Sequence, residues 1–415
     1  MSVADLDLVP QPEISEAVDR ARRAEFPRGA SIDFADLEEQ SRLGALDELR
    51  REEPVSWVPA LGGWLVTSHA LAREVLARRE DFTVRSEANL VRVSLGNMML
   101  TSDGASHDRQ RAPFNPPFRT RAVSERFWAP VAGRLDTLLA EIAPRGGCEL
   151  VSEFALPFAV AVAGDVLGLS LNDVAKIGRL YDAFAGAMTY DGDPEPQRAA
   201  DAARAELNAI LHGELARVRD APDTSVTAAV ASDHERGLDD DTIVAQLRVI
   251  LFGAIETVQS MVVNALLLLL EYPEQLAAAR TNPQLRANAV EEAIRLIPPV
   301  SFIERWAARD CTLGSVLIPH GEFVGVSIPA ANRDPEQFPD PARFDIRREN
   351  TRRHLGFSFG IHHCLGINLA RLQGSLAVGV LLERLPGLRL VEATPPVGFA
   401  FRRPARLLLA WEVRS

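Results

Sequence analysis

The chain has 415 residues, of which 47% are hydrophobic and 25% charged, a balance typical of a globular protein with enough apolar material for a large core. Its net charge of −12 argues against a general nucleic-acid binder. The cysteines, Cys148, Cys311 and Cys364, are too few and odd in number for a disulfide framework, which fits a reducing cytosol.

The predicted elements begin after residues 1–40, which we expect to be a loosely ordered lead-in. The rest of the chain, 41–415, is predicted to be a single domain. A strand-like stretch lies at about 55–66, and a helix follows it to about residue 79. Helical spacing predicts further helices at 122–142, 172–188, 196–219 and 241–271.

The second half of the chain mixes helix with short strands. Asn282 and Pro283 supply a cap and a first turn for a helix that ends before Pro298. Strand-like runs occupy about 302–328 and 387–413. Proline and glycine are frequent between Ile328 and Gly366, so a long irregular segment is expected there, and such segments are usually functional. The predicted fold is mainly α with a small β portion.

The longest apolar stretch, Leu247 to Leu270, is interrupted by polar residues that include Arg248 and Glu256. A helix that crosses a bilayer needs ~20 mostly apolar residues. No signal-like stretch opens the chain. We therefore expect a cytoplasmic protein without a membrane anchor.

The strongest chemical signal is the run from Phe357 to Gly366, FSFGIHHCLG. Cys364 lies where irregular chain meets a helix that runs to about Leu385, and free amide donors at a helix start lower the pKa of a thiol. Gly360 and Gly366 allow the backbone to approach a flat ligand closely. An isolated cysteine is more often a buried free thiol. The neighbouring histidines also permit zinc, but no second pair at zinc spacing exists.

This run resembles the cysteine-ligand loop of the cytochromes P-450, and the later Ala370 extends the match. Ser358 departs from the glycine that usually follows the phenylalanine. The resemblance covers the chain from about His107 to its C-terminus. It implies a single-domain cytochrome P-450 fold, with haem b between the long central helix and this loop. Cys364 is then the axial iron ligand, and Phe357, Gly360 and Gly366 contact the haem.

A second signal is Glu292 and Arg295, which share one face of a helix. Taken alone, they are a common surface ion pair worth ~0.2–0.5 kcal/mol. The family resemblance implies that both join Arg333, in the segment Ala330 to Pro335, in a buried network that holds the coil before Cys364.

A third signal lies in the helix 241–271, where Gly253-Ala-Ile-Glu-Thr257 interrupts an apolar stretch. Small residues let a flat cofactor lie against the helix, and the Thr257 hydroxyl can bond back to the Gly253 carbonyl. An acid beside an alcohol suggests proton delivery. A solvent-facing Glu256 and a packing threonine are the plain alternative. The segment is similar to the oxygen-activating helix of the family, which implies catalytic roles for Glu256 and Thr257 and a haem contact for Ala254.

The remaining site expectations come from position in the family. The resemblance implies contacts to the haem propionates from His107, Arg111, Arg305, His354 and His362, since buried carboxylates need cationic or hydrogen-bonding partners. It also places a substrate pocket near Val91, Val93, Met98, Met99, Phe184, Met188, Ala254, Phe302, Ile303, Phe399 and Phe401. Such apolar residues are more often plain core.

The function that follows from the resemblance is haem-thiolate monooxygenation of an organic, largely apolar small molecule by dioxygen. No module for flavin or an iron–sulfur cluster is recognisable, so electrons are expected from a ferredoxin-type donor and its reductase. We expect the donor to dock near Arg109, Arg119, Arg121, Arg352, Arg353 and His363. A peroxygenase or isomerase, and a non-catalytic haem carrier or sensor, remain as alternatives that have no need of the acid–alcohol pair.

Overall fold

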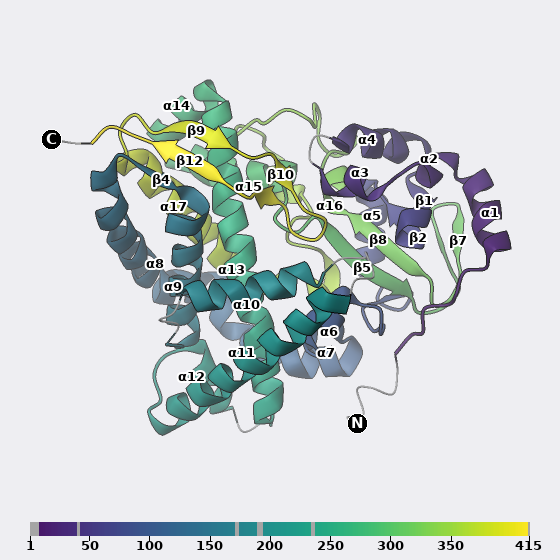
Figure 1. Ribbon diagram of the computed structural model, residues 1–415, viewed down its shortest axis with the longest axis horizontal. Coiled ribbons are helices and arrows are strands. Elements are labelled where there is room, and N and C mark those ends of the chain that lie inside the picture. Colours follow the sequence, from purple (N-terminus) through teal and green to yellow (C-terminus); the bar gives the residue numbers. More distant parts are fainter. Residues whose placement is uncertain (1–7, 40–41, 171–173, 189–193, 234–236, 414–415) are drawn as a thin grey trace.

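The computed structural model describes residues 8–39, 42–170, 174–188, 194–233 and 237–413. Helices make up most of the fold, and small sheets lie towards its edges (Figure 1). This confirms the predicted class, mainly α with a small β portion.

The helices follow the predicted pattern closely. The first half of the chain forms α1 (Glu16–Glu25), α2 (Pro27–Ala30), α3 (Phe34–Glu38), α4 (Leu43–Glu52), α5 (His69–Ala77), α6 (Leu90–Leu95), α7 (Gly104–Arg111), α8 (Thr120–Ile142) and α9 (Leu156–Leu167). The rest of the chain forms α10 (Val174–Gly186), α11 (Pro194–Asp220), α12 (Val226–Ala231), α13 (Asp240–Glu271), α14 (Pro273–Thr281), α15 (Pro283–Leu296), α16 (Ile328–Ala331) and α17 (Ile367–Arg384). The long predicted helices are confirmed to within a few residues, and the predicted start of α10 at 172 lies outside the described residues.

The strands form one larger sheet and three small ones. The larger sheet has the order β1-β2-β8-β5-β3, from β1 (Val55–Val58), β2 (Gly63–Val66), β8 (Phe323–Ser327), β5 (Phe302–Ala307) and β3 (Phe82–Thr83). The others pair β4 (Gly147–Glu149), β12 (Leu407–Ala410) and β9 (Arg389–Ala393), β10 (Pro396–Val397) with β11 (Arg403–Pro404), and β6 (Cys311–Leu313) with β7 (Val316–Ile318). Only β2 and β8 pair in parallel among the described strands.

Helix α13 is the central element of the helical part (Figure 1). It is long and apolar enough to cross a membrane, yet 78% of its most apolar window is buried inside the protein. It packs against α9, α11, α15 and α17. A helix that is apolar on every side is stable in water only when other elements surround it, so α13 serves as the core around which the helices assemble.

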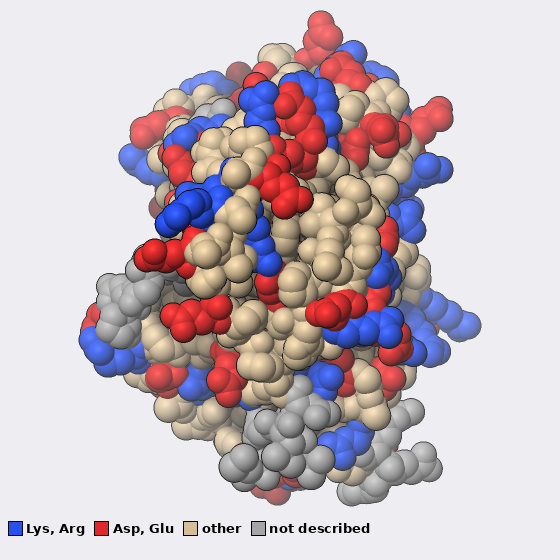
Figure 2. Space-filling model, turned by 90° about the vertical axis from the view of Figure 1, so that its right-hand side faces the viewer, with Lys and Arg blue, Asp and Glu red and all other residues tan. Residues whose placement is uncertain are grey.

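The N-terminal segment differs from its expectation. Over residues 8–39 it forms three helices rather than a loose lead-in, because polar caps and ion pairs fix it. Ser15 caps α1, and Asp33 and Asp36 form a reciprocal capping box at α3. Arg22 also bonds Glu322 at 2.7 Å. On the molecular face where α1 lies, acidic and basic side chains are mixed rather than segregated (Figure 2).

The long irregular segment before Cys364 is confirmed. Between α16 and α17 it contains only short 3-10 turns, at Thr351–Arg353 and Gly360–His362. Three of its carbonyls accept hydrogen bonds from one buried side chain of α15, Arg295, and these bonds replace the ladder of a regular element. These bonds therefore fix the backbone conformation of the segment although it lacks regular structure.

Candidate active site

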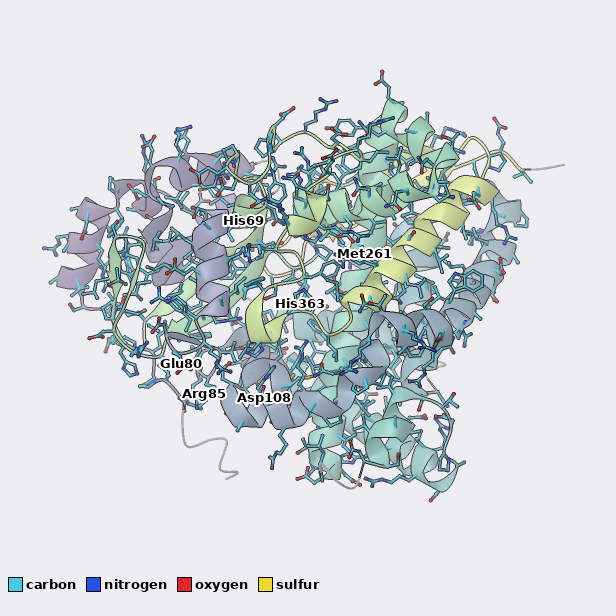
Figure 3. All side chains as sticks on the ribbon, turned by 180° about the vertical axis from the view of Figure 1, so that it is seen from behind. His69, Glu80, Arg85, Asp108, Met261 and His363 are labelled. Carbon is cyan, nitrogen blue, oxygen red and sulfur yellow. The ribbon has the colours of Figure 1, made fainter. Side chains whose placement is uncertain are left out.

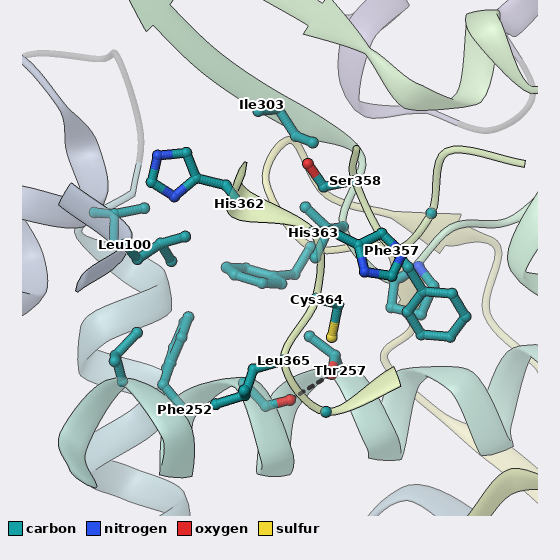
Figure 4. A pocket seen from close by; sticks show the side chains of 18 of the residues that line it. Leu100, Phe252, Thr257, Ile303, Phe357, Ser358, His362, His363, Cys364 and Leu365 are labelled. Carbon is teal, nitrogen blue, oxygen red and sulfur yellow. Dashed lines mark hydrogen bonds between the residues drawn. The ribbon is translucent and has the colours of Figure 1, made fainter. Parts of the chain in front are cut away.

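A cavity of about 340 Å³ separates α13 from the segment that carries Cys364. Its floor is the loop from Leu355 to Gly366, and its opposite wall is the middle of α13. Figure 4 shows the Cys364 sulfur on the loop side and Thr257 on α13 facing it. The described lining is mainly apolar. Its charged members are Arg111, Glu304 and Arg305, with His362 and His363 as further titratable groups.

Cys364 lies ahead of α17 and is half-buried. Its backbone N–H donates to the Phe357 carbonyl at 2.9 Å, which closes the loop. Burial raises the pKa of the Cys364 thiol, whereas the Gly366 N–H and the Arg111 and Arg371 charges act in the opposite direction. The expected lowering of this pKa by the helix start is therefore outweighed by burial. A bound metal ion would reverse this balance, because coordination deprotonates a thiol outright.

Three of the expected cations lie at the cavity: Arg111, Arg305 and His362. Burial lowers the pKa of Arg305 to about 10 and the pKa of His362 to about 4. His362 Nε2 bonds the Asp103 carboxylate at 2.8 Å. Arg111, Arg305 and His362 thus lie together at one side of the cavity, with Asp103 and Glu304 as the nearby acids.

His107 does not line the cavity, but it lies directly behind His362. It is buried on α7, and its ring packs edge-on against the His362 ring with centroids 4.7 Å apart. His107 Nε2 and His362 Nδ1 are buried and have no hydrogen-bond partner among the described residues. Buried polar atoms are almost always satisfied, so two adjacent orphans indicate a missing hydrogen-bond partner.

His354 lies apart from this set, contrary to our expectation. Its Nε2 bonds the Glu291 carboxylate at 3.2 Å, and its Nδ1 accepts from the Gly356 N–H at 3.1 Å. Both ring nitrogens are used, and the residue is not part of the described cavity lining. The backbone at 354–356 turns the ring towards α15, which position in the sequence alone does not reveal.

The glycines of the loop serve different purposes. Gly366 lines the cavity, and a Cβ there would meet open space, so it leaves room for a flat ligand. Gly360 has a φ of 73°, and a Cβ there would lie 2.2 Å from the Leu76 carbonyl oxygen. Gly360 is thus required by packing against α5 and does not line the cavity, which corrects its expected ligand contact. Ser358 also has a positive φ, 59°, where a side chain is strained.

The residues of the third sequence signal lie on two different faces of α13. Gly253, Ala254 and Thr257 line the cavity, and the Thr257 hydroxyl donates back to the Gly253 carbonyl as expected (dashed in Figure 4). Glu256 points elsewhere: it is buried, accepts a hydrogen bond from Gln259, and lies 3.5 Å from Arg403. The acid and the alcohol are neighbours in sequence but do not share one cavity face.

Glu292 and Arg295 form a fully buried, bidentate ion pair at 2.8 Å, and Arg295 bonds the carbonyls of Asn332, Pro341 and Arg343. The third member is not Arg333. Arg348 takes that place and bonds Glu292 at 3.0 Å. Burial lowers the pKa of Arg333, as do the like charges of Arg295 and Arg50. The coil brings Arg348, and not Arg333, to the Glu292 carboxylate. Nothing in the spacing around Arg347-Arg348 marks this residue.

Most of the apolar residues expected at the pocket lie there, namely Val91, Met99, Met188, Ala254, Phe302, Ile303, Phe399 and Phe401. Val93, Met98 and Phe184 do not. Met98 and Phe184 are almost wholly buried in the core, and α6 turns Val93 away from the cavity. Other lining residues were not expected there, among them Leu90, Leu100, Val249, Ile250 and Val300, whose signal is their helical or strand spacing from residues already named.

These features fit a flat, dianionic group that brings its own metal. Within the described ranges, no set of three His, Cys, Asp or Glu side chains could hold a metal ion by itself. A haem needs one thiolate, a small-residue wall and partners for two carboxylates. Cys364 supplies the thiolate, and the turn at Gly253 and Ala254 supplies the wall of small residues. The cations and the orphaned nitrogens of His107 and His362 are the partners for the carboxylates.

Proteins of similar sequence and structure support the same interpretation of the site. The family model for Cytochrome P450 matches residues 198–387. Cytochrome P450 107B1 of Saccharopolyspora erythraea is 33% identical over 371 residues, 85% of this chain and 89% of that protein. The 6-deoxyerythronolide B hydroxylase of the same organism is 35% identical over 363 residues, which cover 83% of this chain and 88% of the hydroxylase. The crystal structure of P450BioI with a hexadec-9Z-enoic acid-ligated acyl carrier protein has a TM-score of 0.83 and 26% identity, covering 89% of this chain and 97% of that one.

Proposed function

The chain belongs to the cytochrome P450 family of oxidoreductases, and from this premise we propose that it is a monooxygenase that inserts one atom of dioxygen into a largely apolar organic molecule. The observation that carries the proposal is the cavity itself. Cys364 faces Thr257 and the small residues of α13 across it, with unsatisfied basic groups at one side.

Haem b is the proposed cofactor. Cys364 would bind the iron, Arg111, Arg305, His107 and His362 would hold the propionates, and Phe357 and Gly366 would support the ring from below. When bound, the haem supplies the reduction and cleavage of dioxygen, which a thiolate ligand favours. The protein supplies position, charge and protons.

Thr257 and Glu256 divide the proton chemistry between them. The Thr257 hydroxyl already donates to the Gly253 carbonyl, so its oxygen is free to accept a hydrogen bond from a water in the cavity. Glu256 is held outside the cavity by Gln259 and Arg403. We infer that Glu256 relays protons from the side of Arg403 towards that water, while Thr257 orients the last transfer.

The substrate class follows from the lining. Phe252, Phe302, Phe399 and Phe401, with Met99 and Met188, give a wide apolar surface that fits a molecule with few polar groups. Two relatives carry names consistent with this: one hydroxylates 6-deoxyerythronolide B, and another binds a long-chain acyl group on a carrier protein. A bulky, largely apolar natural product or acyl chain is therefore the proposed substrate type.

The electron donor is proposed to be an acidic, ferredoxin-type protein that docks below the cysteine loop. Arg109, Arg119, Arg352 and Arg353 are exposed there, and Arg111 bonds the His363 carbonyl, which joins α7 to the loop. Figure 3 shows the same side of the molecule, with Asp108 on α7 and His363 on the loop before α17. Salt should slow reduction by such a donor, since screening weakens the attraction. Rates that ignore both salt and charge reversal at Arg109 and Arg353 would contradict this interface.

The protein is further proposed to act in the cytoplasm. Its one apolar helix of membrane-spanning length among the described residues is α13, which is mostly buried in the fold.

The test of the function is an isotope experiment. Apolar compounds are first screened for the spectral shift that follows displacement of iron-bound water. With a compound that binds, a ferredoxin system and labelled dioxygen, the product should carry one labelled oxygen atom. If the protein forms product with hydrogen peroxide but none with dioxygen and electrons, its function is peroxygenation and not monooxygenation. Binding without any product would favour a haem carrier.

A further inference from the structure

Behind the cysteine loop lies a buried charge cluster that has no part in the chemistry described so far. It joins Glu291 of α15, Arg371 of α17 and His354 of the irregular segment. Arg371 bonds Glu291 through two nitrogens, at 2.6 and 2.9 Å, and His354 bonds it at 3.2 Å. Glu291 and His354 are buried, whereas Arg371 is partly exposed.

The hydrogen-bond geometry fixes the charges of this cluster. His354 Nδ1 accepts from the Gly356 N–H, so the ring proton resides on Nε2 and is donated to Glu291. Burial acts to raise the pKa of Glu291, but the bonds from His354 and Arg371 outweigh it and set that pKa to about 2. Glu291 is therefore the anion of the cluster, and Arg371 is the cation bonded to it through two nitrogens.

The cluster reaches Cys364 through Phe357. The Arg371 guanidinium lies over the Phe357 ring, 5.3 Å from its centroid, and the His354 ring lies 5.5 Å from it on centroids. The Phe357 carbonyl accepts the Cys364 N–H. Phe357 also lines the cavity beside Cys364. Arg371 is close enough for its charge to lower the pKa of the Cys364 thiol, against the larger effect of burial.

We propose that Arg371 and Glu291 are positioning residues that hold Phe357 beneath the haem site and set the reduction potential of the haem–thiolate centre, Arg371 raising it and Glu291 lowering it. The inference rests on the proposed function. The reason for the signs is electrostatic: the ferric centre carries one more positive charge than the ferrous one, so a nearby cation favours reduction and a nearby anion opposes it. Charges outside the ligands are known means of tuning such centres.

The test compares Arg371→Gln with Glu291→Gln by spectroelectrochemical titration of the purified haem-loaded protein. The potential should fall in Arg371→Gln and rise in Glu291→Gln, and the double variant should return towards the wild-type value. Arg371→Lys should recover most of the potential, because it restores the charge. The matched control is Arg384→Gln on the same helix, whose partner Asp136 is exposed, and its potential should not change.

A merely structural cluster predicts a different pattern. Both single variants would then lose stability, and their potentials would stay unchanged or move together in one direction. That result, or a shift as large in Arg384→Gln, would overturn the proposal. Should Arg371→Gln fail to retain haem, Glu291→Gln still decides the sign, because its potential is expected to rise. Failure of the proposed function is recognised separately, because the isotope experiment on the wild-type protein would then give no product labelled from dioxygen.

Discussion

The buried network around Glu292 allows a quantitative prediction of stability. Arg333 was expected to be its third member, but Arg348 occupies that place, so substitution of the two arginines should have different effects. Glu292 is fully buried and accepts bonds from Arg295, from Arg348 at 3.0 Å and from the Asp345 N–H at 3.1 Å. Arg333 bonds neither acid nor carbonyl in this set, and its Nε has no partner among the described residues. We therefore expect Arg348→Gln to destabilise the protein and Arg333→Gln to change its stability little.

The magnitude follows from the bonds lost. Arg348 contributes one hydrogen bond to a buried charge, worth ~1.5–3 kcal/mol. It also bonds the carbonyls of Pro339 and Asp340, which water can reach once the side chain is shortened. Glu292 keeps its pair with Arg295, so the loss stays below the ~3–5 kcal/mol expected when a buried charge is left unpaired. Arg348→Gln should thus cost about 2–3 kcal/mol, and Arg333→Gln less than about 1 kcal/mol, typical of a site without bonds to lose.

The assay is urea unfolding of the haem-loaded variants, followed both by the haem absorption band and by far-ultraviolet circular dichroism. Arg348→Gln should show the lower midpoint by both probes. The reasoning fails if Arg333→Gln costs as much as Arg348→Gln, because Arg333 would then be the third member of the network after all.

Three further outcomes follow from the structure. Ser358→Gly should raise the free energy of unfolding by roughly 0.5–1 kcal/mol in the same urea assay, since it removes a strained left-handed side chain, and any loss would argue against that strain. The pKa of Glu291 is about 2 against an ordinary 4.5, so its stabilisation is complete above about pH 4.5 and is lost as the pH falls towards 2. Between about pH 5 and about pH 3 the wild type should therefore lose roughly 2 kcal/mol more unfolding free energy than Glu291→Gln, and parallel pH profiles would refute the assignment. Thr257→Ala should retain haem and consume electrons but divert most of them to hydrogen peroxide, which is checked by measuring product and peroxide formed per electron pair. If the variant couples electrons to product as well as the wild type does, the Thr257 hydroxyl has no part in the mechanism.

Much of the fold could be predicted because its signals are local. The helices α8, α11, α13 and α15 each carry their own apolar spacing or caps, and their bounds follow from that. The N-terminal helices α1 and α3 were missed because they bury little apolar surface. They are fixed by caps and by contacts such as Arg22 to Glu322, a partner far away in sequence.

The candidate site could be predicted where one short segment carries its parts. Cys364, Thr257 and Arg305 each lie at the cavity, as expected from their motifs. The errors concern residues whose direction depends on a distant partner. His354 turns to Glu291, Glu256 to Arg403, and Gly360 packs on the backbone of α5. Spacing places such residues on an element, but only the packed neighbours decide which way they point.

The central claim is that Cys364 binds the haem iron, and its most direct test is the absorption spectrum of the reduced protein with carbon monoxide. The account predicts the red-shifted Soret band of a thiolate complex in the wild type, in Cys148→Ala and in Cys311→Ala, whose cysteines are buried away from the cavity. Cys364→Ala should lose that band even when haem is retained. A thiolate-type band that persists in Cys364→Ala, or disappears in either of the other variants, would contradict the account.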